Sequence, residues 1–196
     1  MNRRLNQQIK FVIEVDKMKN ILRQTLLTDK SRRENDAEHS WHLALMAMVL
    51  HEYADQSKVD LYRVLKMALV HDLIEIDAGD TFAYDEAGNE SKAERERMAA
   101  DRIFALLPED QGGELRALWE EFDAEETADA QYAAAIDRLQ PLLCNYATEG
   151  HTWKDGRVTS GQVRKRMRII KEAAPELWQL AEDIIQSSIE KGWLQE

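Results

Sequence analysis

Apolar residues recur every three or four positions along almost the whole chain, and this spacing constrains the fold more than any other feature. The period is that of amphipathic helices, and no alternating run of β-branched residues indicates a strand. Helices are expected over 5–27, 37–54, 60–76, 90–107, 113–123, 127–149, 160–172 and 175–192. The sequence therefore predicts an all-α fold, a single compact bundle of about seven or eight helices.

The length of 196 residues suits one domain. We expect that domain to span 1–196, with its core over about 15–150 and the C-terminal helices (160–192) packing on it. Only 3 prolines and 8 glycines occur, as in a compact globular protein. The single cysteine, Cys144, lies in the apolar run "LLCNY", which favours a buried structural role over a reactive thiol.

The net charge of −11 argues against binding to nucleic acid polymers or to anionic membranes. It leaves room for a small anionic substrate, because a local metal ion and a few arginines can override the distant field. The sequence contains neither an uncharged apolar stretch of membrane-spanning length nor a leader followed by a cleavage site. We therefore expect a cytoplasmic protein.

The segment "LVHDLIEIDAGD" (69–80) places one histidine and four carboxylates in an otherwise apolar run. A buried carboxylate without a partner is costly, so a group of them indicates a nearby cation. His71 and Asp72 are adjacent, so on a helix their side chains point about 100° apart and can approach one ion from two sides. Glu75 lies one turn from His71 on the same face. Two ligands do not hold a metal firmly, so others are required.

Two further candidates lie on other predicted helices. His39 is at the start of the second helix, and Asp137 is surrounded by apolar residues in "AAAIDRLQPLL". Arg138 follows Asp137 but points about 100° away on a helix, so a metal explains this carboxylate better.

The order His39, then His71 and Asp72, then Asp137, on three helices, resembles the HD-domain metal-dependent phosphohydrolases. The resemblance covers roughly 15–150 and, within that family, is strongest to the small 5'-deoxynucleotidases. Three local matches carry it: "MKNILR" (18–23), "ENDAEHS" (34–40) and "HDLIEIDAGD" (71–80).

The resemblance implies a role for each matching residue. Glu75 would orient or deprotonate the attacking water, and Asp80 would assist it or help to hold a weak second ion such as Mg near Glu75. Arg23 would contact the phosphate. The implied ligands of one divalent transition metal ion (Mn, Co, Fe or Zn) are His39, His71, Asp72 and Asp137.

The implied function is removal of phosphate from a small nucleotide-like 5'-monophosphate, with deoxyribonucleoside 5'-monophosphates as the expected substrates. Metal-activated water would attack directly, without a covalent phosphoenzyme. The chain departs from the family after Arg23, where Gln24 stands and no aromatic residue follows until Phe82. The preference between deoxyribose and ribose is therefore left open.

Two alternatives remain beside this hydrolase. One is an HD-fold regulatory protein that binds a metal and an anion without significant turnover; Glu75 and Asp80, which a binding scaffold would not need, favour the enzyme. The other is an oxygenase, which the absence of histidine from 73–136 disfavours. The long N-terminal helix and the closing helix pair could pack against a second copy, so a homodimer is expected.

Other residues are assigned structural roles. Asp36 and Glu38 are expected to cap the second helix or to support the ligands, and either Arg32 or Arg33 to form an ion pair or line the pocket. His42 is not expected to bind the metal. The residues expected in the core from their helical spacing include Trp41, Met46, Met48 and Met67.

Overall fold

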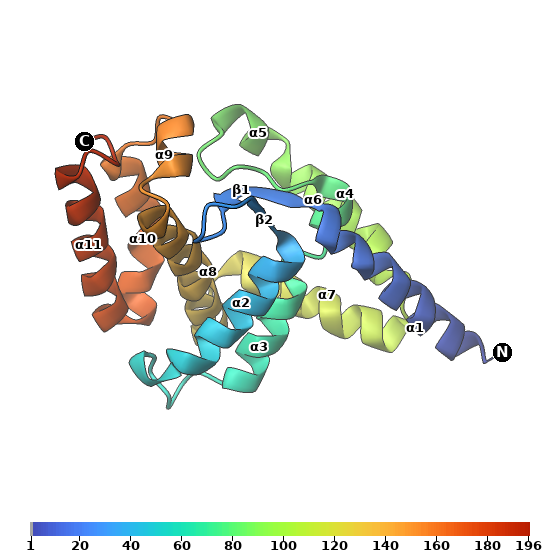
Figure 1. Ribbon diagram of the computed structural model, residues 1–196. Coiled ribbons are helices and arrows are strands. Elements are labelled where there is room, and N and C mark those ends of the chain that lie inside the picture. The colour runs from blue at the N-terminus through green and yellow to red at the C-terminus, as the bar shows by residue number, and fades with distance from the viewer. Residues whose placement is uncertain (1) are drawn as a thin grey trace.

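The structure is a computed structural model that describes residues 2–196, and it is built almost entirely of helices (Figure 1). The α-helices are α1 (Arg3–Glu14), α2 (Asp36–Val49), α3 (Leu61–Val70), α4 (Glu75–Ala78), α5 (Glu86–Glu90), α6 (Lys92–Phe104), α7 (Glu109–Ala124), α8 (Ala128–Ala147), α9 (His151–Asp155), α10 (Ser160–Ala173) and α11 (Pro175–Glu190). Two 3₁₀ helices, η1 (Val15–Asn20) and η2 (His51–Tyr53), and two strands, β1 (Leu22–Leu26) and β2 (Arg33–Asn35), complete it. The all-α prediction is confirmed.

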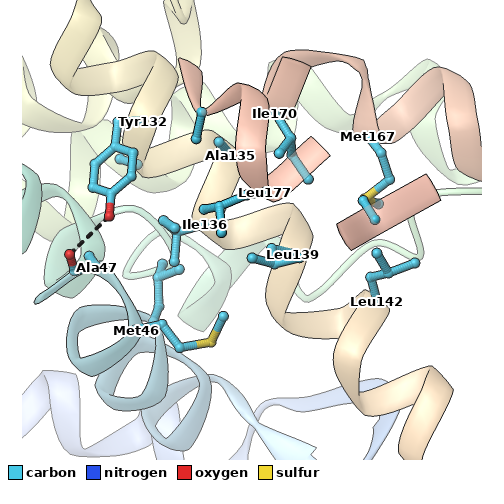
Figure 2. Close-up of a cluster of buried hydrophobic side chains, with 14 of the residues drawn as sticks. Met46, Ala47, Tyr132, Ala135, Ile136, Leu139, Leu142, Met167, Ile170 and Leu177 are labelled. Atoms are coloured by element: carbon cyan, nitrogen blue, oxygen red, sulfur yellow. Dashed lines mark hydrogen bonds between the residues drawn. The ribbon is translucent and has the colours of Figure 1, made fainter. Parts of the chain in front are cut away.

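Helix α8 is the centre of the core, with α2, α3, α7, α10 and α11 packed around it (Figure 1). Three consecutive alanines at 133–135 are all buried and let the neighbouring helices approach closely. Figure 2 shows Met46 of α2 and Leu177 of α11 near Ile136 of α8, and all three belong to one buried cluster. The phenol of Tyr132 donates a hydrogen bond to the carbonyl oxygen of Ala47 at 3.0 Å, so the one polar atom of this buried ring is satisfied.

The predicted first helix over 5–27 is wrong in its second half. Helix α1 ends at Glu14, η1 follows, and β1 then pairs antiparallel with β2, with Leu22 opposite Asn35. The amide of Asp36 also donates to the carbonyl oxygen of Ile21 at 3.1 Å. The apolar period continues across this segment, but pairing with β2 across the loop 27–32 overrides it. The consequence is that Arg23 lies on a strand rather than at a helix end.

The predicted helix over 60–76 is also interrupted. Helix α3 ends at Val70, residues 71–74 form tight turns, and α4 begins at Glu75. In the turns the amide of Glu75 donates to the carbonyl of Asp72, three residues back, at 2.9 Å. Gly79, at φ +74°, then ends α4. His71 and Glu75 therefore do not share a face of one helix, although the chain reversal still keeps them close.

Two of the four expected core residues on α2 and α3 are exposed instead. Met46 and Met67 are buried, but Trp41 is 64% and Met48 is 54% exposed. One face of α2 packs against α3 and α8, and Trp41, Leu45 and Met48 recur along the opposite face. Within residues 2–196, none of the helices combines the length and the apolar character that crossing a membrane requires.

Candidate metal centre

Four donor groups from three parts of the fold converge beside α8. His39 lies near the start of α2, His71 and Asp72 lie in the turn after α3, and Asp137 lies in the middle of α8. Nε2 of His39 lies 2.9 Å from Oδ1 of Asp137 and 3.9 Å from Oδ2 of Asp72. Nε2 of His71 lies 3.1 Å from Oδ2 of Asp72 and 3.7 Å from Oδ1 of Asp137. The four residues that the sequence singled out are thus brought together.

The start of α2 fixes the position of His39. Asn35 caps the helix in a capping box with Glu38, and Arg32 donates to both carboxylate oxygens of Glu38 at 2.9 and 2.6 Å. The expected roles of Glu38 as a cap and of Arg32 in an ion pair are confirmed. These contacts fix the residue at which α2 begins. They therefore also fix the position along the helix axis from which the imidazole of His39 projects into the core.

A buried hydrogen-bond chain sets the tautomer of His39. The amide nitrogen of Gln140 donates to Glu34 at 2.7 Å, so its oxygen faces Nδ1 of His39 at 3.2 Å. An amide oxygen only accepts, so Nδ1 carries a proton and Nε2 presents its lone pair. Nδ1 of His71 faces the carbonyl oxygen of Ala68 at 3.0 Å, which fixes the second ring in the same way.

The residues present fit a divalent cation. In neutral rings of these tautomers, both Nε2 atoms direct lone pairs at carboxylate oxygens, an arrangement that requires positive charge between them. Nε2 of His71 and Oε2 of Glu75 are buried and have no hydrogen-bond partner among residues 2–196. Two imidazole nitrogens with two carboxylates are the donor set of Zn, Mn, Fe or Co sites. One group of candidate ligands comprises His39, His71 and Asp72, to which Asp137 is adjacent.

The pKa shifts of these groups also favour positive charge at this place. Burial opposes a positive charge on His71, but Asp72 and Asp137 outweigh burial and raise the pKa of the imidazole to about 10. Burial likewise opposes ionisation of Asp137, yet its contacts with His39 and His71 hold the pKa of that carboxyl well below its usual range. A buried space that retains two carboxylates in their charged form attracts a cation.

A second cluster of carboxylates adjoins the first. Asp36, Glu75 and Asp80 bring one oxygen each within 4.8 Å of one another. Burial, followed by the charge of Asp72, raises the pKa of Asp36 to about 7 and raises the pKa of Glu75 well above its ordinary value. The sequence had indicated Glu75 and Asp80 but had assigned Asp36 to capping or support. The sequence feature that could have indicated Asp36 as part of the site is its position in the first turn of a buried helix, three residues before His39.

Arg23 reaches into the space between the two clusters from β1. Its Nη1 donates to Oδ2 of Asp72 at 2.8 Å and approaches Oδ1 of Asp36 at 3.4 Å, and its side chain is only 12% exposed. Burial opposes its charge, but the carboxylates of Asp72 and Asp80 outweigh burial and raise the pKa of the guanidinium. Arg23 thus links a predicted ligand to the second cluster.

A cavity of about 180 Å³ opens onto these groups. Phe82 and Tyr84, from the loop after α4, and Trp153 of α9 line it; His151 is absent from its lining and faces Asp155 at 3.3 Å. Among the other lining residues, which carry no recognisable local motif, the sequence reasoning missed Lys92, Phe122, Asn145 and Arg166.

Comparison with known proteins places this geometry in context. The family model described as HD domain matches residues 15–178. The chain is 34% identical over 127 residues to the 5'-deoxynucleotidase HDDC2 of Homo sapiens, covering 65% of this chain and 60% of that protein, and 33% identical over 125 residues to the 5'-deoxynucleotidase HDDC2 of Mus musculus, covering 64% and 61%. The match thus spans about 60% of the length of these curated relatives.

Solved structures give a longer match. The crystal structure of a predicted metal-dependent phosphohydrolase from Magnetospirillum magnetotacticum MS-1 is 55% identical, with a TM-score of 0.95, over 98% of this chain and 96% of that one. An HD-domain phosphohydrolase from Listeria innocua is 17% identical, with a TM-score of 0.65, over 94% and 92% of the two chains. The second likeness concerns the fold alone.

Proposed function

The chain belongs to the HD-domain family, and from this premise we propose that it is a metal-dependent phosphomonoesterase acting on deoxyribonucleoside 5'-monophosphates. The observation that carries the proposal is the convergence of two Nε2 atoms with the carboxylates of Asp72 and Asp137, beside a cavity that His71, Asp72 and Asp137 line. The buried, unpartnered Oε2 of Glu75 lies in the same cavity wall. The names of the relatives support the substrate class.

The four converging residues would hold one divalent transition metal ion, Mn, Co, Fe or Zn: His39, His71, Asp72 and Asp137. When bound, such an ion neutralises charge on phosphoryl oxygens and lowers the pKa of water. Glu75 and Asp80 would in addition hold a weaker second ion such as Mg, since their cluster with Asp36 offers carboxylate oxygens only.

The chain's own side chains have distinct roles in this proposal. Glu75 accepts a proton from the attacking water, because its free oxygen is not committed to any described residue. Asp80, in the same carboxylate cluster, orients that water. Arg23 binds the oxygens of the phosphate, and its contacts with Asp72 and Asp36 position the guanidinium for it. A phosphate entering the cavity would compete with these carboxylates for the same donors.

The base and sugar would occupy the outer cavity. Phe82, Tyr84 and Trp153 line it, so aromatic faces are available there for a nucleoside. Gln24 also lines the cavity directly after Arg23, where the family's aromatic residue is missing. In this proposal, the preference for deoxyribose depends on the side chains of Phe82, Tyr84 and Trp153.

Phosphate release tests the proposal. Chelator-treated protein, with Mn, Co, Mg or Zn added back, is assayed on ribo- and deoxyribonucleoside 5'-monophosphates, 3'-monophosphates and triphosphates. We expect release from 5'-monophosphates only, dependent on added metal, with the deoxy compounds preferred. Release that is indifferent to metal, or absent across the panel while metal is bound, would overturn the assignment.

We propose in addition that the protein forms a homodimer. Leu5, Ile9, Val12 and Ile13 form an exposed apolar face on α1, which none of the described residues of this chain covers. Light scattering on the wild type and on an Ile9→Glu/Ile13→Glu variant tests this: the wild type should have twice the mass of the variant. The expected cytoplasmic location stays a prediction.

A further inference from the structure

A second, larger cavity adjoins the one at the candidate metal centre. Its volume is about 510 Å³, and it lies between α8, α10 and the loop after α4. The residues that line both cavities are Ala83, Tyr84, Glu125, Arg138 and Arg166. Because the two cavities share these lining residues, they are neighbours, and a ligand that extended from the metal centre past Tyr84 would reach α10.

The wall that α10 contributes is basic, although the chain as a whole carries −11. In "SGQVRKRMRIIKEA" five residues are basic and Glu172 alone is acidic. Lys165, Arg166 and Arg168 line the second cavity together with Arg138 of α8, against Glu125 and Glu172. Four positive groups thus face two negative ones, whereas carboxylates dominate the metal centre.

Three of these basic side chains are not engaged elsewhere in the protein. Arg138 is committed to an ion pair with Glu125, and Arg164, outside the cavity, pairs with Glu182 at 3.1 Å. Lys165, Arg166 and Arg168 make no ion pair and no side-chain hydrogen bond with any side chain that the structure describes.

Arg166 is the member of this group that reaches furthest toward the metal centre, since it also lines the first cavity. It is half-buried, and its charge acts on the hydroxyl of Tyr84, where burial raises the pKa to about 12 and Arg166 opposes that rise. Partial burial removes water from a guanidinium at a cost in free energy, and charge-assisted hydrogen bonds to an anion would offset that cost. Its planar fork of donors suits a phosphate.

We propose that the physiological substrate carries a second anionic group, separate from the phosphate that is removed, and that Arg166, Lys165 and Arg168 bind it. The inference rests on the proposed function and extends it from simple nucleoside 5'-monophosphates to nucleotides with a further phosphate or phosphodiester on the nucleoside. A 5'-monophosphate alone leaves the second cavity without an anion.

Hydrolysis of three compounds by the metal-loaded protein tests this. Thymidine 5'-monophosphate has one anionic group, thymidine 3',5'-bisphosphate has a second terminal phosphate, and 5'-phosphorylated dithymidylate has a phosphodiester instead. We expect kcat/KM for at least one two-anion compound to exceed that for the monophosphate by about tenfold, the effect of one charge-assisted contact. The compound that is preferred identifies the source of the second anion.

Matched variants assign the effect to the cavity. Arg166→Gln should reduce the preference for the two-anion compound to near unity, and Lys165→Gln/Arg168→Gln, at exposed positions that do not threaten folding, should reduce it in part. Lys171→Gln removes the same charge from the same helix but lies outside the lining, so it should keep the preference. Equal kcat/KM for all three compounds, or equal effects of Arg166→Gln and Lys171→Gln, would overturn the inference.

The outcome is distinguishable from failure of the proposed function. If the wild type releases no phosphate from any compound, the same three compounds are titrated into it calorimetrically, since nothing is then consumed. Tighter binding of a two-anion compound, lost in Arg166→Gln and retained in Lys171→Gln, would support the anion site without the hydrolase. Normal hydrolysis of the monophosphate without any preference would reject the anion site alone.

Discussion

At the scale of single residues, the candidate site depends on side chains that hold other side chains in place. Gln140 is fully buried and lies one turn after Asp137 on α8, so one helix supplies both a candidate ligand and the group that orients His39. Glu34 completes the chain by accepting from Gln140. The orientation of an imidazole at a metal site depends on such partners.

Replacement of Gln140 tests this dependence. In Gln140→Ala, Nδ1 of His39 loses its acceptor and the ring can adopt the other tautomer, so affinity for Mn or Zn should fall by roughly 10- to 100-fold. The measurement is the dissociation constant from competition with a chelator. Gln131→Ala, on the same helix away from the cavity, serves as the control. Unchanged affinity in Gln140→Ala would remove this role.

Replacement of Glu75 tests whether this residue transfers a proton rather than holding the tightly bound metal ion. Glu75→Gln keeps the shape and the packing but cannot accept a proton, so kcat should fall by roughly 10²- to 10⁴-fold while the tightly held ion remains bound. Turnover and metal content are measured on the same sample. Asp77→Asn, also on α4 but paired with Arg102 outside the cavity, should retain kcat. A variant of Glu75 with near-normal turnover would contradict the proposal.

At the scale of elements, the sequence could predict what local periodicity determines. The long helices around α8 follow their apolar period, and Asp137 stood out because most residues around it in the sequence are apolar. The hairpin of β1 and β2 could not be predicted, because the backbone pairing that places Leu22 opposite Asn35 is not visible in the helical period of the apolar residues. For the same reason the carboxylates of Asp36 and Glu75 could not be recognised as neighbours. The break after Val70 was hidden by apolar residues that continue through the turns.

The end of α4 offers a prediction about how the second carboxylate cluster is positioned. Gly79 has φ +74° and ψ 148°, a region that only glycine adopts without strain, and it directly precedes Asp80. Gly79→Ala should lower the free energy of unfolding by about 1–3 kcal/mol although there is space for the added methyl group. Gly113→Ala, in the interior of α7 with equal space, should instead raise it by roughly 0.5–1 kcal/mol. Chemical denaturation measures both, and a Gly79→Ala variant as stable as the wild type would contradict the argument from backbone strain.

At the scale of the whole molecule, charge is distributed unevenly. The chain has more acidic than basic residues, but α10 beside the cavity is basic. The electrostatic field at the candidate site therefore differs from the one that the net charge suggests. The net charge argues against binding to polymeric nucleic acids, and this expectation stays a prediction. The sequence could not place Arg166 against Tyr84 and Arg138, because these residues come from three separate elements. The candidate metal ligands could be singled out by resemblance, whereas this wall of the cavity could not.

The candidate metal centre also joins three parts of the fold, since α2, the turn after α3, and α8 each contribute candidate ligands. An ion that binds only the folded chain stabilises it by mass action, by about 2.7 kcal/mol at 100 times its dissociation constant. For a chain of this size that corresponds to a rise in Tm of roughly 5–10 °C. Scanning calorimetry of chelator-treated protein, with and without Mn, measures the rise. His71→Ala should abolish it, while His151→Ala, at an exposed position on α9, should leave it intact. An equal rise in His71→Ala and in the wild type would mean that Mn stabilises the fold from some other place.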